Sequence, residues 1–466
     1  MNIKIKNLGA LDEAEFSLGD LTIICGNNNT GKTYATYALY GFLSFWQKNY
    51  IVDVNDEDIN RLVDVGVLHI DLRKYIDNAE HILADSCRKY TKQLPTVFAA
   101  PADRFTDAEF CITIVHEDIR VMDQYHRRIR TTMPELYSVT KNKGSLDLVV
   151  TYLLEKEKIE FPHFVIMEFI GSAIKDIIFG NIFLIPFIAS AERTGATIFR
   201  KESYFTRNRM LEVMLEETRT ADNNVNDTLN YLLKNHQSYA LPVEDNMDFM
   251  RRLEAIAKQR SFLVEQHPDI LYDFADIIGG EYSVTPHDEL YYAPRGKQIK
   301  LSMDEGSSAV RSLLIIGFYL RHMALPGDIL MVDEPELNLH PENQRRMARL
   351  FARLINIGIK VFVTTHSDYI IKELNTLIML NHDTPHLKRI AEQEGYRKEE
   401  LISADQAKVY IAENVPVKTN EDQQEIRRQT LVLADIDPEL GIEAPSFDTA
   451  IETMNRIQEE IVWGGE

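Results

Sequence analysis

A glycine-rich octet near the N-terminus constrains the fold of this chain more than any other feature. The octet matches the pattern G-x-x-x-x-G-K-T at every fixed position. Its members are Gly26, Asn27, Asn28, Asn29, Thr30, Gly31, Lys32 and Thr33. An apolar run, residues 21–25, precedes the octet, and apolar residues with helical spacing follow it. This context predicts the order strand, loop, helix.

The same octet predicts a binding site for nucleotide phosphates. Backbone N–H groups of such a loop point at phosphate oxygens, the Lys32 ammonium neutralises the β and γ phosphates, and the Thr33 hydroxyl binds Mg²⁺. We therefore expect ATP and Mg²⁺ as cofactors. A chance glycine turn before a core helix is the alternative interpretation, and the flanking strand and helix argue against it.

Two acidic residues end another apolar run, ILMVDEPE, which begins at Ile329. Enzymes with a phosphate-binding loop need a carboxylate at the end of a neighbouring strand to hold Mg²⁺. We predict that Asp333 has this role, directly or through water, and that Glu334 is the general base that polarises the attacking water. The alternative is an ordinary acidic cap before the helix that we expect from Pro341.

The residues around these acids resemble a known family. The run 333–341, DEPELNLHP, is followed further along the chain by TTHS, residues 364–367. Together they resemble the ATP-binding-cassette heads of the RecF, SMC and OLD groups. The resemblance implies that Glu334 is the catalytic carboxylate, that residues 336–340 touch the opposite subunit, and that His366 is the switch histidine near the γ-phosphate. A lone histidine after a strand is otherwise more often structural. Here one βαβ unit places His366 on the same rim as the octet.

Heads of this family complete their ATP site with a signature loop from a second subunit. The candidate is DEGSSAV, residues 304–310, in which Ser307 and Ser308 precede a helix that we expect from near Val310. Ala309 stands where relatives usually have glycine, so a plain serine cap is the alternative. The run AERTG, residues 191–195, resembles a motif of OLD-like, AAA15-type ATPases, and there we expect a phosphate or interface contact for Arg193.

The predicted fold class is α/β: an ABC-type P-loop ATPase head, with a mixed β-sheet flanked by helices and a large, mainly helical insertion. The expected parts are the N-terminal part of the head (1–46), the helical insertion (47–179), a central strand and loop of the head (180–200), a helical segment (201–274), the part with the signature loop, Asp333 and His366 (275–380), and a C-terminal mixed α/β tail (381–466). The resemblance covers less than half of the chain.

Composition excludes several classes of protein. The chain has 51 basic and 72 acidic residues and a net charge of −21, which excludes a body-wide cationic surface for nucleic acid. The uncharged stretch 177–191 falls short of the roughly twenty residues that span a bilayer, so we expect no membrane contact. The first residues lack a basic region followed by an apolar one, so we expect no secretory signal, and three cysteines without metal-like spacing predict a reducing, cytoplasmic location.

Acidic residues in the tail permit a nuclease hypothesis. Asp435 and Asp437 invite comparison with the TOPRIM nuclease that follows the ATPase in full-length OLD proteins, and Glu413 is the candidate for its glutamate. The glycine-turn setting of that glutamate is missing and the tail is short for the domain. We therefore interpret these acids as solvated turn residues.

Our leading functional hypothesis follows from the resemblance. The chain resembles the ATPase subunits of two-gene phage-defence systems such as Septu and PARIS, which implies an ATP-hydrolysing sensor that controls a separate nuclease effector, HNH or TOPRIM, through nucleotide-dependent head dimerisation. We expect a homodimer or a larger even-numbered homo-oligomer, with nucleic acid contacted through the partner. The alternatives are a DNA-repair or chromosome ATPase of RecF or SMC type, a self-contained OLD-like nuclease, and a transporter ATPase.

Overall fold

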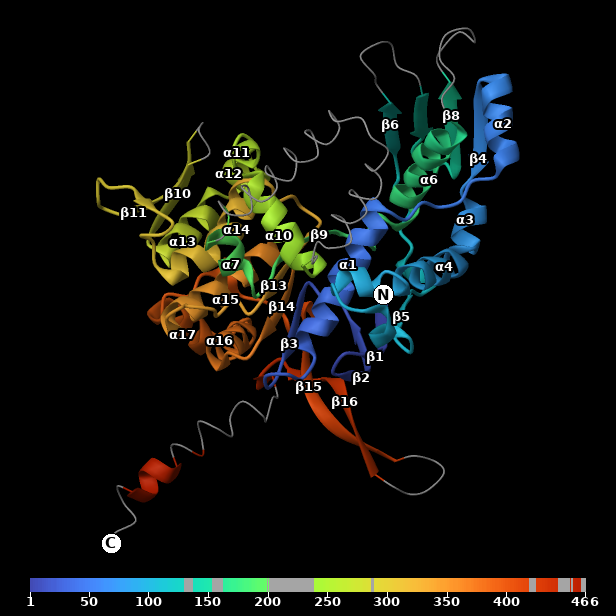
Figure 1. Cartoon of the computed structure of the whole chain (residues 1–466). Coiled ribbons are helices and arrows are strands. Elements are labelled where there is room, and N and C mark those ends of the chain that lie inside the picture. Colours follow the sequence, from blue (N-terminus) through green and yellow to red (C-terminus); the bar gives the residue numbers. More distant parts are fainter. Residues whose placement is uncertain are drawn as a thin grey trace, which may run out of the picture. The chain divides into compact units, whose positions relative to one another are not determined.

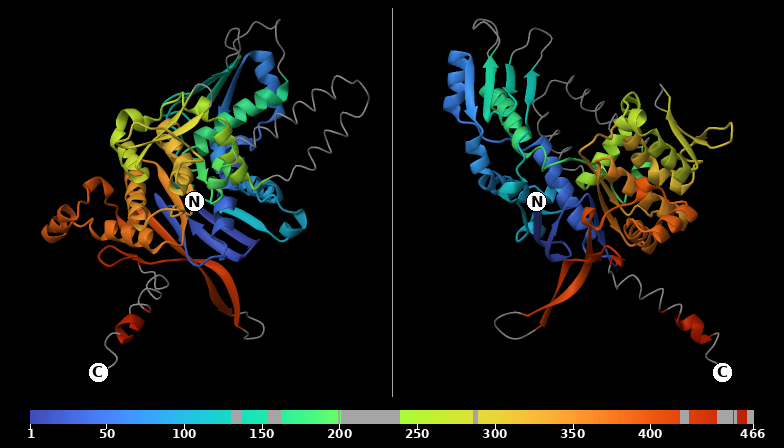
Figure 2. Two further views of the ribbon diagram at one scale, coloured as in Figure 1. Left: turned by 60° about the vertical axis from the view of Figure 1, so that its left-hand side comes forward. Right: turned by 180° about the vertical axis from the view of Figure 1, so that it is seen from behind.

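The computed structural model describes residues 1–129, 137–152, 162–198, 200, 239–285, 289–418, 425–442, 453 and 456–461 (Figures 1 and 2). The chain forms two compact units. Unit 1 consists of Met1–Lys4, Phe42–Lys92 and Glu109–Ile185, and unit 2 consists of Ile5–Gly41, Gln93–Ala108 and Pro186–Glu466. The limits of the parts that we derived from the sequence stay predictions.

A six-stranded mixed sheet is the framework of unit 2. Its strand order is β16-β15-β3-β14-β13-β9. The bounds are β3 (Leu21–Cys25), β9 (Ile185–Ala189), β13 (Asp328–Asp333), β14 (Lys360–Thr365), β15 (Ala407–Lys418) and β16 (Glu425–Leu433). Strands β15, β3, β14 and β13 pair in parallel, whereas β16 pairs antiparallel with β15 and forms a long ribbon with it in Figure 1. The predicted α/β head with a mixed sheet is confirmed.

The central strands of this sheet are buried along their whole length. Every residue of β3 and β13, and all but the first of β14, is buried. Such continuous apolar runs are typical of parallel strands covered on both faces. Helix α15 (Pro341–Asn356) connects β13 to β14, and its buried Met347, Phe351 and Leu354 share one helix face. The predicted βαβ unit is therefore present.

The register of these strands aligns the ends that carry the sequence motifs. Thr365 pairs with Cys25 across β14 and β3, and Asp333 pairs with Thr364 across β13 and β14. The residues that follow each strand therefore emerge at one rim of the sheet, as we predicted for His366.

The other elements of unit 2 surround this sheet. They are α5 (Leu94–Val97), α7 (Arg193–Ile198), α10 (Leu241–Arg251), α11 (Leu253–Ile256), α12 (Phe262–Gln266), α13 (Pro268–Ile278), α14 (Ser308–His322), α16 (Asp368–Met379), α17 (Pro385–Gln393), and the strands β2 (Leu11–Ser17), β10 (Gly280–Val284), β11 (Leu290–Pro294), β12 (Leu301–Ser302), β17 (Ile436–Asp437) and β18 (Gly441–Ile442). After α13, the strands β10, β11 and β12 form the antiparallel pairs β10–β11 and β11–β12. Residues 201–238 of the predicted helical segment (201–274) lie outside the described residues, as do residues 443–452 of the predicted C-terminal tail.

Unit 1 contains a sheet that the sequence did not reveal. Its helices are α2 (Asp56–Val65), α3 (Arg73–Asp77), α4 (Ala79–Thr91), α6 (His163–Phe179) and the second part of α1 (Lys32–Lys48). Strands β4 (Val67–Asp71), β8 (Asp147–Tyr152), β7 (Tyr137–Lys141) and β6 (Tyr125–Ile129) form a four-stranded sheet in that order, with antiparallel pairing throughout. The unit also includes β5 (Glu109–Thr113), and the N-terminal strand β1 (Asn2–Leu8) begins in it. The prediction of a mainly helical insertion missed this sheet.

Aromatic side chains form the core of unit 1. Trp46 lies 4.4 Å from Phe183 and 5.2 Å from Phe179 between ring centroids, and Phe42 stacks on Phe110 at 5.1 Å. The buried ammonium of Lys175 donates to the carbonyl oxygens of residues 46, 47 and 50, at the C-terminal end of α1. These bonds satisfy carbonyl groups that a helix end leaves without a partner.

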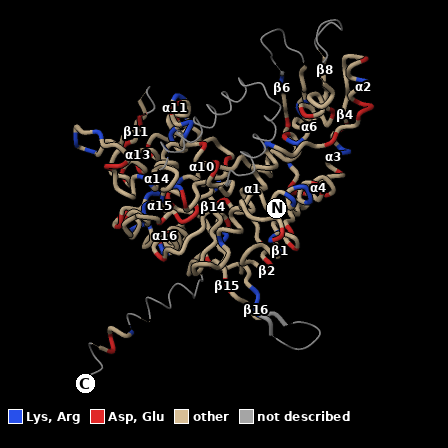
Figure 3. Tube along the Cα trace, in the orientation of Figure 1, with Lys and Arg blue, Asp and Glu red and all other residues tan. Residues whose placement is uncertain are grey.

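Charged residues of both signs are interspersed along the chain in Figure 3. Within the described ranges, the helices are too short or too polar to cross a bilayer.

Candidate nucleotide-binding site

The glycine-rich loop connects β3 to α1 and needs its two fixed glycines. Gly26 has φ +132° and Gly31 has φ +91°, which other residues rarely adopt. A Cβ atom at Gly26 would lie 2.8 Å from the Ala412 carbonyl oxygen, and one at Gly31 would lie 2.7 Å from the Leu11 side chain. Both backbone conformation and space therefore require glycine at these positions.

Lys32 begins α1 and directs its ammonium into the loop. Its Nζ donates to the carbonyl oxygens of Gly26, at 2.9 Å, and Asn27, at 2.6 Å. Burial lowers the pKa of Lys32, while the negative charges of Glu334 and Asp333 raise it. The neighbouring Thr33 is exposed, so its hydroxyl is accessible to a ligand. A nucleotide phosphate with Mg²⁺ requires a cation, backbone N–H groups and a hydroxyl. Lys32, the loop and Thr33 supply these groups.

Asp333 ends β13 directly below the rim, with 1% of its surface exposed. Its Oδ1 accepts a hydrogen bond from the Thr364 hydroxyl, whereas its Oδ2 is buried without a partner among the described residues. Burial, the largest cause, raises the pKa of Asp333 to about 6, and the charge of Glu334 adds to this. A buried carboxylate oxygen without a donor is unfavourable. The orphaned oxygen fits the Mg²⁺ ligand that we predicted.

Glu334 follows Asp333 in an uncommon backbone conformation. Its φ is +50°, in the left-handed region that side chains other than glycine rarely adopt. Its N–H donates to the Thr364 carbonyl oxygen at 2.9 Å, and its carboxylate Oε1 lies 3.7 Å from Nδ1 of His366. Such conformations persist only where surrounding bonds hold them, and they concentrate at functional sites.

His366 follows β14 and is held by Glu336. One oxygen of Glu336, Oε1, accepts from the His366 backbone N–H at 2.8 Å and lies 3.1 Å from Nδ1 of its ring. The other oxygen, Oε2, is buried without a partner among the described residues. Sequence reasoning placed Glu336 only in a loop toward a second subunit and missed this contact. The dipeptide Pro335-Glu336 directly after Asp333 and Glu334 was the available signal.

A pocket of about 590 Å³ brings these groups together. Its walls are Ala10, Asn28, Asn29, Thr30, Gly31, Lys32, Thr33, Tyr34, Glu334 and His366. This volume lies in the usual range of small-molecule sites. Gly26 and Asn27 belong to the same loop as the lining residues 28–33. Asp333 does not line the pocket; its carboxylate accepts a hydrogen bond from Thr364 on the neighbouring strand. The ends of three neighbouring strands thus supply most of the predicted site.

Ser307 and Ser308, the two signature serines, are not among the described residues that line this pocket. Ser307 caps α14, since its side-chain oxygen accepts from the Val310 N–H at 3.3 Å. Ser307 and Ser308 are both exposed. The structure therefore has the predicted loop at the start of a helix, separate from the nucleotide loop of the same chain.

The expectation for Arg193 is wrong. Its side chain is fully buried at the start of α7, and its guanidinium donates to carbonyl oxygens of residues 190, 312, 333 and 334. A group enclosed in this way contacts neither a phosphate nor a second subunit. Sequence reasoning failed here because bonds to backbone carbonyls leave no residue pattern.

The acids of the tail behave as turn residues. Oδ1 of Asp437 accepts from the N–H groups of Glu439 and Leu440, at 2.7 and 2.8 Å. Across the part of the chain that the structure describes, no three histidine, cysteine or acidic side chains are grouped for a metal ion. The hydrogen bonds of Asp437 and the exposure of both side chains agree with the interpretation that Asp435 and Asp437 are solvated turn acids.

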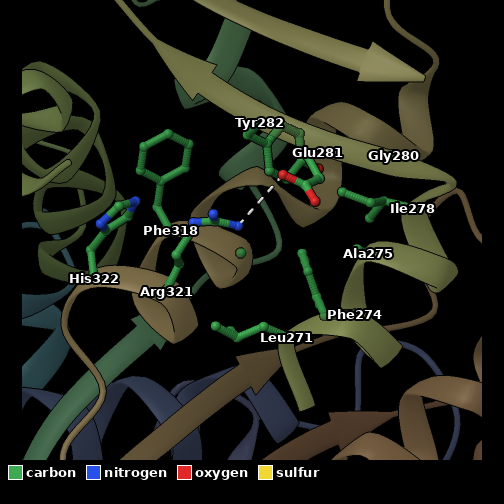
Figure 4. A pocket seen from close by; sticks show the side chains of 11 residues that line it. Leu271, Phe274, Ala275, Ile278, Gly280, Glu281, Tyr282, Phe318, Arg321 and His322 are labelled. Atoms are coloured by element: carbon green, nitrogen blue, oxygen red, sulfur yellow. Dashed lines mark ion pairs between the residues drawn. The ribbon is translucent and has the colours of Figure 1, made fainter. Parts of the chain in front are cut away.

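A second, much smaller pocket of about 30 Å³ lies beside α13 and α14 (Figure 4). Leu271, Phe274 and Phe318 are among the residues that line it, and Arg321 and Glu281, 3.7 Å apart, form an ion pair there. This volume admits about one water molecule. The small pocket is therefore no alternative site for a nucleotide.

Residues 1–371 match the protein family AAA_15, AAA ATPase domain, and this range includes every predicted site residue. A search of curated proteins gave no match. Similar solved structures include the Smc head domain from Pyrococcus furiosus, with an extended coiled coil and bound to the C-terminal domain of ScpA; it is 13% identical, covers 98% of each chain and has a TM-score of 0.31. Another is a SmcHead bound to the C-winged helix domain of ScpA, at 13% identity, 93% and 97% coverage and a TM-score of 0.32. The SMC head domain from Thermotoga maritima has 10% identity, 93% and 98% coverage and a TM-score of 0.30.

Proposed function

The chain belongs to the AAA ATPase domain family, and on that premise we propose that it hydrolyses ATP with Mg²⁺ in a site completed by a second copy of itself. Membership of the family confirms the AAA15-type resemblance that we recognised in the sequence. One observation carries the proposal: the pocket in which Lys32, Glu334 and His366 converge from the ends of three adjacent parallel strands.

The phosphate-binding groups have distinct roles in this proposal. The loop N–H groups of residues 26–33 bind phosphate oxygens, and Lys32 exchanges its two carbonyl partners for the β and γ phosphates. Thr33 and Asp333 hold the metal ion, for which the unpartnered Oδ2 of Asp333 is the supporting observation. When bound, Mg²⁺ supplies positive charge that stabilises the negative charge of the phosphates during transfer.

Hydrolysis depends on Glu334 and His366. Glu334 accepts a proton from the attacking water at its carboxylate, and the fixed backbone of residue 334 aims that carboxylate into the pocket. His366 contacts the γ-phosphate, and the bonds from Glu336 hold its ring on the rim. Because preorganised groups need no rearrangement during the reaction, this rigidity lowers the barrier.

The second copy contributes the signature loop. Ser307 and Ser308 are exposed at the N-terminus of α14, where N–H groups and the helix dipole favour an anion. They do not line the pocket of their own chain, so a head-to-tail pair would bring them to the γ-phosphate of the partner. We propose a homodimer or a larger even-numbered homo-oligomer.

In the cell, we propose that this ATPase is the sensor or regulatory subunit of an antiviral defence complex. Nucleotide-dependent dimerisation would control a separate HNH or TOPRIM nuclease, and that partner would contact nucleic acid. The resemblance of the sequence to ATPase subunits of phage-defence systems supports this, as does the net charge of −21. The cytoplasmic location stays a prediction.

The test has two stages. First, the purified full chain is assayed for ATP hydrolysis with Mg²⁺ and with EDTA, and we expect turnover only with the metal. Second, the chain, the product of the adjacent gene and their complex are incubated separately with plasmid and RNA, with and without ATP. We expect cleavage only when the partner is present and a response to nucleotide.

Two results would contradict the proposal. Metal-dependent cleavage by the isolated chain, lost in the variants Asp435→Ala and Asp437→Ala, would establish a self-contained nuclease. Strong stimulation of ATP hydrolysis by DNA without any partner would favour an ATPase of RecF or SMC type.

A further inference from the structure

Arg193 has an environment that simple packing does not explain. It is among the largest fully buried side chains of the described residues. Its Nε donates to the carbonyl oxygen of Ser312 at 2.7 Å, and its Nη1 donates to those of Ser190, at 2.9 Å, and Asp333, at 2.6 Å. Its Nη2 donates to the carbonyl oxygen of Glu334 at 2.8 Å. One guanidinium therefore connects three separate elements.

Burial of this cation is unfavourable in itself. Burial lowers the pKa of Arg193 to about 10, and the charges of Asp333, Glu336 and Glu334 oppose that change. The group therefore stays charged at neutral pH. An aliphatic side chain would fill the same space without the desolvation of a charge. The hydrogen bonds to specific carbonyl groups are what an arginine adds.

Two of those carbonyl groups, of Asp333 and Glu334, belong to the end of β13, where the predicted metal ligand and the predicted general base lie. Glu334 has a φ of +50°, and its N–H is bonded to Thr364 while its carbonyl oxygen is bonded to Arg193. Hydrogen bonds on both sides of the residue thus hold it in a conformation that it would otherwise leave. The direction of the Glu334 side chain is set by this backbone conformation.

A third carbonyl group belongs to α14, the helix that starts at Ser308. Ser312 lies one turn after the signature serines, and its hydroxyl also bonds to the carbonyl oxygen of Leu337, at 3.1 Å. Because a helix moves as a rigid element, a shift at Ser308 displaces the Ser312 carbonyl group. Arg193 connects this group to the carbonyl group of Glu334.

We propose that Arg193 is a positioning residue that fixes the Glu334 carboxylate for water activation and couples it to the signature end of α14. Engagement of Ser307 and Ser308 by the nucleotide of the second copy then adjusts hydrolysis in the site of their own chain. This inference rests on the proposed ATPase function, and it adds communication between the two sites of a dimer.

The test uses full-length Arg193→Gln and Arg193→Lys. We expect Arg193→Gln to lower kcat roughly 100-fold, because small displacements of a reacting group have effects of that size, with KM for ATP within about threefold of wild type. Arg193→Lys keeps the charge and part of the bonding, and should recover roughly a tenth of the wild-type kcat. A loss confined to kcat and partly restored by lysine identifies positioning.

Arg353→Gln is the matched control. Arg353 is also a buried arginine, 5% exposed, but it pairs with Asp269 and Asp273 away from the pocket. We expect Arg353→Gln to lower the melting temperature and leave kcat of the folded protein unchanged. If Arg193→Gln behaves in the same way, the proposal is wrong.

Two further measurements keep the result clear. If Arg193→Gln does not fold, Arg193→Lys decides, and a kcat equal to wild type would overturn the inference. The coupling is tested by a double-mutant cycle on kcat with Ser308→Ala and Arg193→Lys, for which we expect effects that do not add; additive effects would refute coupling to α14. Failure of the ATPase function is a different result, because wild-type protein would then not hydrolyse ATP.

Discussion

The ammonium of Lys32 donates hydrogen bonds to two backbone carbonyl groups of the glycine-rich loop. Lys32→Ala removes that charge from the place where the β and γ phosphates bind. Charge-assisted hydrogen bonds contribute about 1.5–3 kcal/mol, so we expect ATP affinity to fall roughly 10- to 100-fold. Isothermal titration measures the change, and Lys48→Ala, an exposed position in the same helix, serves as the control. If Lys32→Ala binds ATP with wild-type affinity, the glycine-rich loop is not the nucleotide-binding site.

Glu334→Gln separates binding from chemistry. The amide preserves the shape of the side chain but cannot accept the proton of the attacking water. We expect ATP affinity close to wild type and a turnover at least about 100-fold lower, which is typical for loss of a general base. Glu342→Gln, an exposed acid in the first turn of α15, should hydrolyse ATP normally. Near wild-type turnover in Glu334→Gln would show that another residue is the general base.

Burial of the Asp333 carboxylate lowers the stability of the folded chain, although the same carboxylate is the proposed ligand of Mg²⁺. Its pKa is raised from 3.8 to about 6 in the folded chain, mainly by burial. The folded state therefore binds the proton more tightly than the unfolded state, and stability falls as pH rises from about 4 to about 6. Two pKa units correspond to about 3 kcal/mol, which the ionised carboxylate costs the folded protein at higher pH.

Asp333→Asn should therefore make the metal-free protein more stable at pH 8 while it abolishes Mg²⁺-dependent hydrolysis. The amide carries no charge, so the gain should shrink as pH is lowered from 8 to 5. Thermal unfolding in EDTA at both pH values measures the difference. A variant that is less stable than wild type at pH 8 would show that the carboxylate is not strained by burial.

At the scale of elements, α14 depends on close packing against α13 at one glycine. A Cβ atom at Gly317 would lie 2.6 Å from the Phe274 ring and 3.0 Å from the Tyr282 ring. We expect Gly317→Ala to lower the free energy of unfolding by about 1–3 kcal/mol through overpacking. Gly195→Ala, in α7, meets no atom within 4 Å and should be neutral or slightly stabilising. Urea unfolding of both variants compares them, and equal stability would contradict the packing argument.

The rim of the main sheet was predictable because its strands carry two kinds of signal. Buried parallel strands such as β3 and β13 appear as continuous apolar runs, and the residues that need a fixed chemistry follow directly after them. Spacing by one βαβ unit then placed His366 beside the glycine-rich loop. Local pattern and chemistry thus gave the same answer for this part of the fold.

The missed features lack such a signal. Strand β4 has the sequence VLHID, in which only Leu68 and Ile70 are buried, so its pattern is too short to distinguish from the helices around it. The roles of Arg193 and Glu336 depend on contacts with backbone groups that are distant along the chain. Any residue type can supply a backbone carbonyl or N–H group, and the sequence therefore does not mark the partner.

At the scale of the whole molecule, the proposed mechanism needs two chains. The pocket has walls from the glycine-rich loop, Glu334 and His366, and the exposed serines 307 and 308 lie outside it. Head-to-tail pairing under twofold symmetry would complete two identical sites, each with the loop of one chain and the serines of the other. When a site is divided between two chains in this way, two different inactive variants can complement each other.

We predict such complementation between a loop variant and a serine variant. Lys32→Ala damages the loop and Ser308→Arg blocks the signature surface, so each variant alone should be inactive. A mixed dimer of the two variants contains one site with both an intact Lys32 and an intact Ser308, and isolated with two affinity tags it should hydrolyse ATP at about half of the wild-type rate. The control pairs wild type with a chain that carries both substitutions. This dimer has the same number of changes but no intact site, because every site then contains one damaged component. We expect no hydrolysis from it, and activity in the control without activity in the first dimer would mean that each chain forms its ATP site alone.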